Sequence, residues 1–444
     1  MIKNKFIPMA LATVLSVGMI AGCGNAGTDA NVGTEQEVQT ETVAETATEN
    51  NEAKEAETGS EATSTEASSG ADEKSEASEE TEEAAPVAVN GIRERSDEMR
   101  DISAMELVSE MTAGWNLGNT LDAHGTSGLE AETYWGNPKI TKELIDTVCE
   151  KGFDSIRIPI TWYDHVGDAP DYAIDPEWMD RVEEVVNYAL DDGMFVLIDT
   201  HHEESWRILD AEHIDAVDAE NIALWTQIAE RFKDYGDHLV FEGLNEPRTK
   251  GSAAEWNGGT SEERDYVNRL NKSFVDTVRA TGGNNEKRLL LVTTYGGSNT
   301  VEAVNQLEVP DDEHIGVAIH AYEPYDFTFA SGQSTELFRW DGSHNGDIIK
   351  LLVRLNSKFI ENGIPVLITE YGAVNKNENN DEIAKWAEAY VSRATEKGIP
   401  LFWWDNGVYD QEGEKFAILD RQNLTWYREN VVDAVIKASY TKEN

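Results

Sequence analysis

Cysteine and basic residues are scarce in this chain. Its 444 residues include two cysteines, and 36 lysines and arginines stand against 85 aspartates and glutamates, giving a formal charge of -49. Two cysteines cannot build a disulfide framework, and we expect Cys149, in a helix-like stretch, to be a buried free thiol. The negative charge argues against nucleic acid or an anionic membrane surface as a partner. A neutral substrate fits this composition better.

Apolar runs long enough to span a membrane comfortably are also missing. The chain begins with Lys3 and Lys5, continues with an apolar run over 6–20, and reaches Cys23 through the sequence IAGC. This layout is typical of a secretory signal peptide, and its ending resembles the lipobox of bacterial lipoproteins. We therefore expect residues 1–22 to be a lipoprotein signal peptide and Cys23 to carry lipid. The alternative is a plain secretory signal with a chance cysteine.

Lipidation at this position would fix where the protein acts. The chain would be extracellular and anchored by lipid to the outer face of the bacterial cell membrane. It would touch the membrane only through that N-terminal anchor.

Aromatic residues are absent from positions 24 to 90. The stretch holds about eighteen acidic residues against Lys54 and Lys74, and threonine, alanine and serine make up most of the rest. Such a composition cannot bury enough apolar surface to offset the loss of chain entropy. We expect residues 23–91 to be a disordered acidic linker. It would either hold a domain away from the lipid surface or act simply as a solubilising tail.

The remaining residues, 92–444, are expected to form one α/β domain. Apolar runs alternate with helix-like segments, and no break rich in proline, serine or glycine interrupts them. The eight predicted strands are 112–119, 153–160, 194–201, 238–245, 288–294, 314–321, 364–371 and 399–406. Nearly continuous apolar strands that alternate with helices predict a parallel sheet covered on both faces. Eight such units predict a (β/α)8 TIM barrel.

Polar residues follow seven of the eight predicted strands; the fifth, ending near Thr294, is uninformative. Reacting groups of such barrels lie at the carboxyl ends of the strands. Glu246 follows the fourth strand and Glu370 the seventh, and these strands lie across the barrel mouth from each other. Glycoside hydrolysis requires two carboxylates that flank one bond. The other residues at these ends are Asn116, Asn119, Arg157, His201, His202, Asn245, His320, Tyr322, Tyr371, Trp403 and Trp404.

Seven motifs resemble those of glycoside hydrolase family 5, whose barrels carry both catalytic glutamates after strands four and seven. In chain order they are NLGNTLDA, RIPITW, DTHHE, GLNEPR, HAYEPYDF, ITEYG and FWWDNG, and they cover essentially the whole globular part. The resemblance is closest to the endoglucanase-rich bacterial branch. It implies a retaining endo-β-1,4-glucanase, or cellulase, that cuts internal bonds of cellulose or related β-glucans. It implies no cofactor, and a β-glucan polysaccharide as the partner.

The same resemblance implies a role for individual residues. Glu246 would be the acid/base and Glu370 the nucleophile, which Arg157 and Tyr322 would keep ionised through hydrogen bonds. Asn245 would bind the sugar 2-hydroxyl. The other residues expected to bind substrate or to support the site are His201, His202, His320, Trp404, Asn119, Asp122 and Trp206.

Elementary chemistry agrees with these roles. An arginine beside Glu370 lowers the pKa of that carboxyl, whereas partial desolvation and a facing like charge raise a carboxyl pKa, as we expect for Glu246. A retaining mechanism would place the two carboxyl groups about 5 to 5.5 Å apart.

Sugar faces are apolar, so aromatic platforms are also expected. We choose Trp404 to stack beneath the scissile sugar, although strand alternation would also allow Trp403. Six further tryptophans lie in or near loops at strand ends, and we expect about half of them to contact glycan. They are Trp115, Trp135, Trp162, Trp206, Trp256 and Trp340.

Two other classes of protein fit parts of the sequence. The cluster at 201–204, HHEE, could indicate a metal hydrolase or deacetylase. Adjacent residues of a strand point to opposite faces, and no helical H-E-x-x-H pattern is present, so we predict no metal. A lipoprotein that captures oligosaccharide for a transporter would fit the lipobox and the tryptophans. It would have no need for two opposed glutamates.

Substrate choice within the enzyme class is less determined. The same barrel and glutamate pair serve xyloglucanases, licheninases, xylanases and mannanases, and the difference lies in loops such as 248–260 and 323–345. No separate carbohydrate-binding module is visible, which favours soluble or amorphous glucan over crystalline cellulose. The sequence does not determine the oligomeric state, and we take the chain as a monomer.

Overall fold

The computed structural model describes part of the chain. The described residues are 91–203, 205–330, 332, 336–411 and 413–441. The predicted signal peptide, the lipidated Cys23 and the acidic linker up to residue 90 lie outside them. Among the described helices, none combines the length and the apolar character needed to cross a bilayer.

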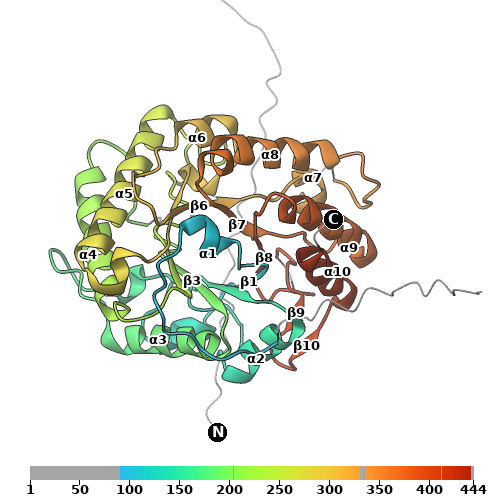
Figure 1. Cartoon of the computed structure of the whole chain (residues 1–444), viewed down its shortest axis with the longest axis horizontal. Helices are drawn as coiled ribbons and strands as arrows, with labels where there is room; N and C mark the ends of the chain where they lie inside the picture. The colour runs from blue at the N-terminus through green and yellow to red at the C-terminus, as the bar shows by residue number, and fades with distance from the viewer. Residues whose placement is uncertain (1–90, 204, 331, 333–335, 412, 442–444) are drawn as a thin grey trace, which may run out of the picture. The chain divides into compact units, whose positions relative to one another are not determined.

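Eight parallel strands form a closed barrel in chain order, with β8 pairing back to β1 (Figure 1). They are β1 (Ala113–Leu117), β2 (Ser155–Ile158), β3 (Phe195–Asp199), β4 (Leu239–Glu242), β5 (Leu290–Thr293), β6 (Ile315–His320), β7 (Val366–Tyr371) and β8 (Leu401–Asp405). Each lies inside its predicted range. The predicted (β/α)8 TIM barrel is therefore confirmed.

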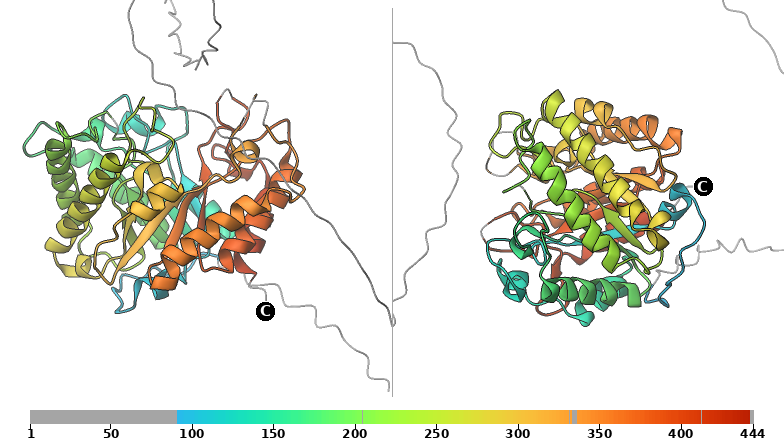
Figure 2. Two further views of the ribbon diagram at one scale, coloured as in Figure 1. Left: turned by 90° about the horizontal axis from the view of Figure 1, so that it is seen from above. Right: turned by 90° about the vertical axis from the view of Figure 1, so that its left-hand side faces the viewer.

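Helices surround this barrel on its outer side, except α1, which lies over one end of it (Figures 1 and 2). They are α1 (Ala104–Val108), α2 (Lys142–Lys151), α3 (Pro176–Asp191), α4 (Ile214–Arg231), α5 (Ser261–Ala280), α6 (Val301–Gln306), α7 (Tyr325–Thr328), α8 (Asn345–Lys358), α9 (Asn380–Thr395) and α10 (Glu429–Tyr440). Two short strands, β9 (Leu419–Asp420) and β10 (Thr425–Trp426), pair antiparallel after β8. The 3-10 helices are η1 (Leu129–Thr133), η2 (Tyr163–His165), η3 (Gly283–Glu286), η4 (Tyr295–Gly297) and η5 (Ile360–Asn362).

Local sequence signals explain where helices begin and end. The side chain of Asp175 accepts a hydrogen bond from the backbone N–H of Glu177, and Pro176 occupies the first turn of α3. Helix α2 ends at Lys151 and is capped by Gly152, whose φ of 116° few other residues adopt. Buried Cys149 lies in this helix as a free thiol, as predicted, and burial raises its pKa to about 12.

The amino end of the barrel is filled by apolar side chains. Leu107 and Val108 of α1 pack into one cluster with inward-facing strand residues, including Phe402. A Cβ atom on Gly114 would lie 2.4 Å from the ring of Phe402, so the position has room only for glycine. Figure 2 shows α1, in blue, at one end of the barrel and long loops at the other. The loop end therefore remains for the polar residues.

Candidate active site

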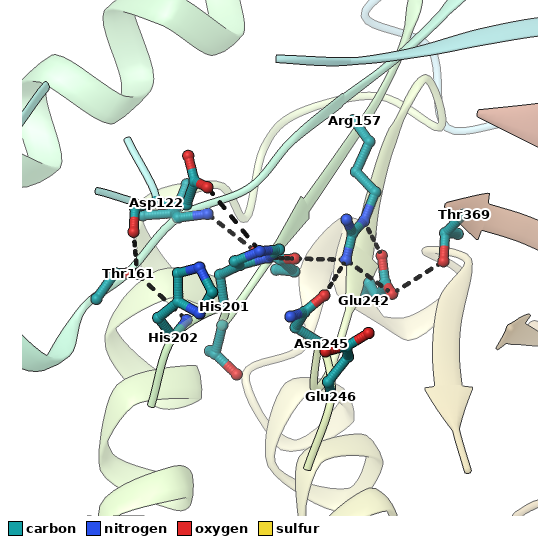
Figure 3. Close-up of polar contacts among 12 residues, drawn as sticks. Asp122, Arg157, Thr161, His201, His202, Glu242, Asn245, Glu246 and Thr369 are labelled. Atoms are coloured by element: carbon teal, nitrogen blue, oxygen red, sulfur yellow. Dashed lines mark hydrogen bonds and ion pairs between the residues drawn. The ribbon is translucent and has the colours of Figure 1, made fainter. Parts of the chain in front are cut away.

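One arginine organises the carboxyl end of the barrel. Arg157 on β2 is fully buried and contacts three carboxylates at nitrogen–oxygen distances of 2.7, 2.6 and 2.8 Å. These belong to Asp199 on β3, Glu242 on β4 and Glu370 on β7. Its Nη2 atom also donates to Oδ1 of Asn245 at 2.8 Å (Figure 3). Burial lowers the pKa of Arg157, but the three carboxylates outweigh burial and hold that pKa above its usual value.

Glu370 is the more enclosed of the two candidate catalytic glutamates. Its Oε1 accepts a hydrogen bond from Nη1 of Arg157 at 2.8 Å, and its Oε2 accepts one from the Tyr322 hydroxyl at 2.9 Å. Both hydrogen bonds implied by the resemblance are present. Burial and the charge of Glu370 hold the pKa of Tyr322 well above its ordinary value, so the phenol keeps the proton that it donates.

Glu246 lies directly after β4 and is more open to solvent. Its side chain is 19% exposed, against 7% for Glu370. Its Oε1 lies 2.8 Å from Nδ1 of His320, and its Oε2 lies 3.5 Å from Nη1 of Arg248. Burial raises the pKa of Glu246, but the hydrogen bond and charge of His320, with Arg248, outweigh burial and lower it. The expected raised pKa is therefore wrong for the unliganded protein.

His320 couples the two glutamates. Its Nδ1 lies 2.8 Å from Oε1 of Glu246 and 3.5 Å from Oε2 of Glu370. Burial lowers the pKa of His320, but both carboxylates raise it and prevail. The ring rests against Gly297, where φ is 62° and a Cβ atom would lie 2.9 Å from Cγ of His320. His320 and Glu246 can thus hold one proton between them.

The spacing of the two glutamates suits a single bond between them. One carboxylate oxygen of Glu246, one of Glu370 and a ring nitrogen of His320 all lie within 4.8 Å of one another. Retaining glycosidases have carboxyl groups about 5 to 5.5 Å apart and inverting enzymes about 6.5 to 9.5 Å, so oxygens this close leave room for a retaining mechanism, which remains a prediction. The same three groups could also hold a metal ion.

His201 and His202 lie together rather than on opposite faces. Their rings meet edge to face with centroids 4.5 Å apart, and both face Asp122 closely enough to hold a metal ion (Figure 3). The expectation that these neighbours diverge is wrong, because they follow the last residue of β3 and do not belong to the strand. Burial lowers the pKa of His201 to about 3, so this ring is neutral. The absence of a catalytic metal remains a prediction.

Trp404, and not Trp403, faces the mouth residues. Trp404 is 9% exposed, and its ring lies nearly parallel to that of His201, with centroids 5.8 Å apart. Trp403 is fully buried, packs on Trp386 of α9, and donates from Nε1 to the backbone oxygen of Phe416 at 3.1 Å. Trp404 therefore has the orientation expected of the stacking platform. Its stacking on a sugar remains a prediction.

Asn119, Asp122 and Trp206 make contacts within the loops. Asp122 is fully buried and accepts hydrogen bonds from the backbone N–H groups of Asn119 and Thr120 at 2.9 and 2.7 Å. The indole of Trp206 donates to Oε2 of Glu203 at 2.8 Å. These contacts shape the mouth, and direct binding of substrate by these residues remains a prediction.

The six loop tryptophans divide between the core and the rim. Three are buried and three are partly or largely exposed, which is the proportion expected to be available to glycan. The buried residues are Trp115, Trp162 and Trp340, and the others are Trp135, at 38%, Trp206, and Trp256, at 61% exposed.

Three carboxylates near the pair were missing from the prediction. Asp199 and Glu242 both contact Arg157, and burial raises their pKa values. Their signal was an acidic residue inside an apolar run, VLIDTH and LVFEGL. Glu414 lies after β8, where burial and the charges of Glu246 and Glu370 raise its pKa.

Comparisons with known proteins agree with this geometry. Residues 118–410 match the family model described as cellulase, glycosyl hydrolase family 5. Endoglucanase A of Ruminococcus albus is 60% identical over 344 residues, which cover 77% of this chain and 94% of that protein.

Solved structures give the same result. A GH5-4 broad-specificity endoglucanase from Ruminococcus champanellensis, with bound cellotriose, is 43% identical with a TM-score of 0.74, covering 76% of this chain and 99% of that one. A GH5 xyloglucan-specific endo-β-1,4-glucanase from a metagenomic library, also with cellotriose, is 46% identical with a TM-score of 0.73. It covers 75% of this chain and 98% of its own.

Proposed function

This chain belongs to the cellulase family, glycosyl hydrolase family 5, and we propose that it hydrolyses internal β-1,4-glucosidic bonds of β-glucans by a retaining double displacement. One observation carries the proposal. Carboxylate oxygens of Glu246 and Glu370 lie within 4.8 Å of each other at the carboxyl end of a (β/α)8 barrel, and Arg157 holds one of the two. This arrangement supplies a fixed anion on one side and a proton carrier on the other.

In the first step, a carboxylate oxygen of Glu370 attacks the anomeric carbon. The bond to the leaving oxygen breaks while Glu246 donates its proton to that oxygen. The proton is available because the pair of Glu246 and His320 holds it, with Nδ1 of His320 2.8 Å from Oε1. Oδ1 of Asn245 accepts a hydrogen bond from Arg157, which holds the amide in place, and its Nδ2 would then donate to the sugar 2-hydroxyl.

In the second step, water cleaves the covalent glycosyl intermediate. Glu246, now ionised, takes a proton from the water, whose oxygen attacks the anomeric carbon and releases Glu370. Two inversions give net retention. Arg157 and Tyr322 stabilise Glu370 each time it returns to the carboxylate form.

The test is the replacement of each glutamate by its amide. Glu246→Gln and Glu370→Gln should each lower the release of reducing sugar from carboxymethyl cellulose by at least about 10³-fold, because general acid–base and nucleophilic groups contribute on this order. NMR of the first product from cellopentaose should show the β-anomer.

Glu110→Gln provides a matched control, because Glu110 is bonded to Arg100 by a surface ion pair and lies outside the site. It should retain wild-type turnover. Undiminished activity in either site variant, or an α-anomer as first product, would overturn the mechanism.

For the polysaccharide itself, we propose soluble or amorphous β-1,4-glucan as the main substrate. Similar proteins include a broad-specificity endoglucanase and a xyloglucan-specific endo-β-1,4-glucanase, so xyloglucan is the first competitor. Initial rates on carboxymethyl cellulose, mixed-linkage glucan, xyloglucan, xylan and glucomannan, at equal sugar concentration, would rank these substrates. A preference for xylan or mannan would refute this choice.

We also propose that the protein is exported and anchored by lipid at Cys23, as the sequence IAGC indicates. Cys23→Ser should move the activity of the expressing bacterium from the membrane fraction to another fraction. Metabolic labelling with radioactive palmitate should mark the wild type alone, and equal labelling of both would refute lipidation at this residue.

The catalytic domain is proposed to act as a monomer. Light scattering of the purified domain during size-exclusion chromatography should give the mass of one chain. The mass of a dimer at micromolar concentration would contradict this proposal.

A further inference from the structure

Asp122 is a buried carboxylate in the loop after β1, and no basic side chain balances its charge. Its two oxygens accept hydrogen bonds from the backbone N–H groups of Asn119 and Thr120, which compensate that charge only in part. Among the described residues, no lysine or arginine forms an ion pair with it, and its one ionic contact is with Nε2 of His201 at 4.0 Å. Buried charges are usually paired or bind a metal ion. Asp122 is therefore a candidate metal ligand.

His201 is held in the way that is usual for a metal-binding histidine. Its Nδ1 lies 2.8 Å from Oδ2 of Asp199, and Nη2 of Arg157 contacts the same oxygen at 2.7 Å. Histidines that bind a metal through one ring nitrogen commonly contact a carboxylate through the other, which fixes the ring and its tautomer. Here the nitrogen nearer to Asp122 is Nε2, and the supporting carboxylate is already in place at Nδ1.

His202 completes a group of three ligands, which we call the Asp122 site. One ring nitrogen of His202, one of His201 and one oxygen of Asp122 all lie within 4.8 Å of one another (Figure 3). The ring of His202 packs against His124 and Trp135, with centroids 5.3 and 5.5 Å apart. Ligand atoms of a tetrahedral Zn²⁺ ion lie about 3.4 Å apart, given bonds of about 2.0 to 2.1 Å. Side-chain movements of about 1 Å would therefore close the site around an ion.

A second group could also hold an ion, but it is less suited to one. It consists of Glu246, His320 and Glu370. Nδ1 of His320 already contacts Glu246 at 2.8 Å, and Nη1 of Arg157 holds Glu370 at 2.8 Å. A metal ion there would break the first contact and would lie close to the guanidinium charge. The Asp122 site is therefore favoured.

The ligands of the Asp122 site select a class of metal. Imidazole nitrogens suit Zn²⁺, Cu²⁺ and Ni²⁺, whereas Ca²⁺ and Mg²⁺ prefer oxygen ligands. Two histidines and one carboxylate are also a known ligand set for Zn²⁺, with a water molecule in the fourth position. The site therefore fits a divalent transition metal better than Ca²⁺ or Mg²⁺.

An ion in this site would lie where the proposed function places a sugar. The ring of His201 lies nearly parallel to that of Trp404, with centroids 5.8 Å apart, and Trp404 is the expected platform for the sugar that becomes attached to the enzyme. Asp199 connects His201 to Arg157, which also holds Glu370. A sugar on Trp404 and an ion on His201 would compete for the same space.

We propose that Asp122, His201 and His202 bind a divalent transition metal ion such as Zn²⁺, and that the bound ion inhibits the enzyme by excluding substrate. The inhibition rests on the proposed function, whereas the binding of the ion does not. The ion takes no part in the double displacement, so the prediction that catalysis uses no metal is unchanged.

Calorimetry tests the binding without any turnover. Zn²⁺ titrated into the untagged full-length protein should bind. His202→Gln should weaken this binding by more than about 100-fold, since loss of a hydrogen-bond partner behind a ligand alone costs about 10- to 100-fold. Zn²⁺ should also raise the Tm of the wild type and not that of His202→Gln. Ca²⁺ at the same concentration should not displace Zn²⁺.

His314→Gln is the matched control, because His314 directly precedes β6 and so lies at the amino end of the barrel, away from the mouth. It should bind Zn²⁺ as the wild type does and retain wild-type turnover. Glu246→Gln distinguishes the two groups of ligands, and it should also bind Zn²⁺ as tightly as the wild type.

Initial rates test where the ion lies. With cellopentaose as substrate, Zn²⁺ should raise KM and leave kcat unchanged, because substrate and ion exclude each other. An excess of EDTA should restore the original KM. A fall in kcat at constant KM would overturn the proposed competition with substrate.

Equal affinity for Zn²⁺ in the wild type and in His202→Gln, or loss of binding in Glu246→Gln, would overturn the Asp122 site. Displacement of Zn²⁺ by Ca²⁺ would overturn the choice of metal. Failure of the proposed function would look different, because the wild type without Zn²⁺ would then leave cellopentaose intact while Zn²⁺ still bound.

Discussion

The two ends of the barrel are built from the same eight strands, yet they bury opposite kinds of side chain. On β3, Leu197 packs with α1 at the amino end, and Asp199, two residues later, contacts Arg157 at the carboxyl end. Both side chains are fully buried. This enzyme therefore separates packing from chemistry along the barrel axis. Apolar side chains at the amino end stabilise the fold, and buried charges at the carboxyl end lower stability but serve catalysis.

The largest effect should come from Arg157→Lys. Lysine cannot contact three carboxylates with a planar fork of donors, so buried charges would lose partners. We expect the free energy of unfolding to fall by about 3 to 5 kcal/mol, and kcat/KM on carboxymethyl cellulose to fall at least about 100-fold because Glu370 loses its donor. Urea unfolding and initial rates measure the two changes.

Arg181→Lys is the matched control, because Arg181 is a buried partner of Glu132 that does not contact the glutamate pair. It should cost stability and leave kcat near the wild-type value. If both lysine variants kept full activity, the buried charges at the carboxyl end would not be needed for catalysis, and the two ends of the barrel would not differ in function.

Leu107→Ala should have a smaller effect, confined to stability. Leu107 lies in the apolar cluster at the amino end, 4% exposed. Truncation leaves a cavity, and the free energy of unfolding should fall by about 2 to 5 kcal/mol. Urea unfolding measures the loss, and kcat at 25 °C should be unchanged in the folded variant. Leu129→Ala, at a 47% exposed position, should change neither quantity. A large fall in kcat for Leu107→Ala would show that the two ends are coupled.

The smallest effect should be seen in the pH profile of His320→Gln. In the wild type the pair of His320 and Glu246 keeps its last proton up to the pKa of His320, which lies above the ordinary value. Without the imidazole, that proton rests on a carboxyl alone, so the alkaline limb of kcat/KM should move to lower pH. We expect a fall of about 10- to 100-fold at the optimum. An alkaline limb that stays in place would assign it to another group.

The fold could be predicted because its signals are local. Apolar runs such as those of β3 and β7 are bounded by turn residues, and their alternation with amphipathic segments fixes the number of units. The packing of α1 into the amino end was not predicted, since nothing in the five residues Ala104–Val108 shows which strands they face.

The sequence predicted which residues form the active site better than it predicted how their charges interact. A family resemblance gave Glu246 and Glu370, and the contacts of Glu370 with Arg157 and Tyr322 require only that strands two, six and seven end on the same side of the barrel. The pKa of Glu246 was predicted in the wrong direction, because it depends on a distance of 2.8 Å to a histidine of β6. Pairing at that scale is set by tertiary structure.

Strand β5 ends without a predicted site residue, but Gly297 in the turn after it backs the ring of His320. Any side chain there would need an unusual backbone angle and would push the imidazole away from Glu246. Almost every substitution at this position would therefore disturb the glutamate pair from a place outside it. The fifth barrel unit carries no reacting group, yet it takes part in catalysis because its glycine has no side chain to displace the ring of His320.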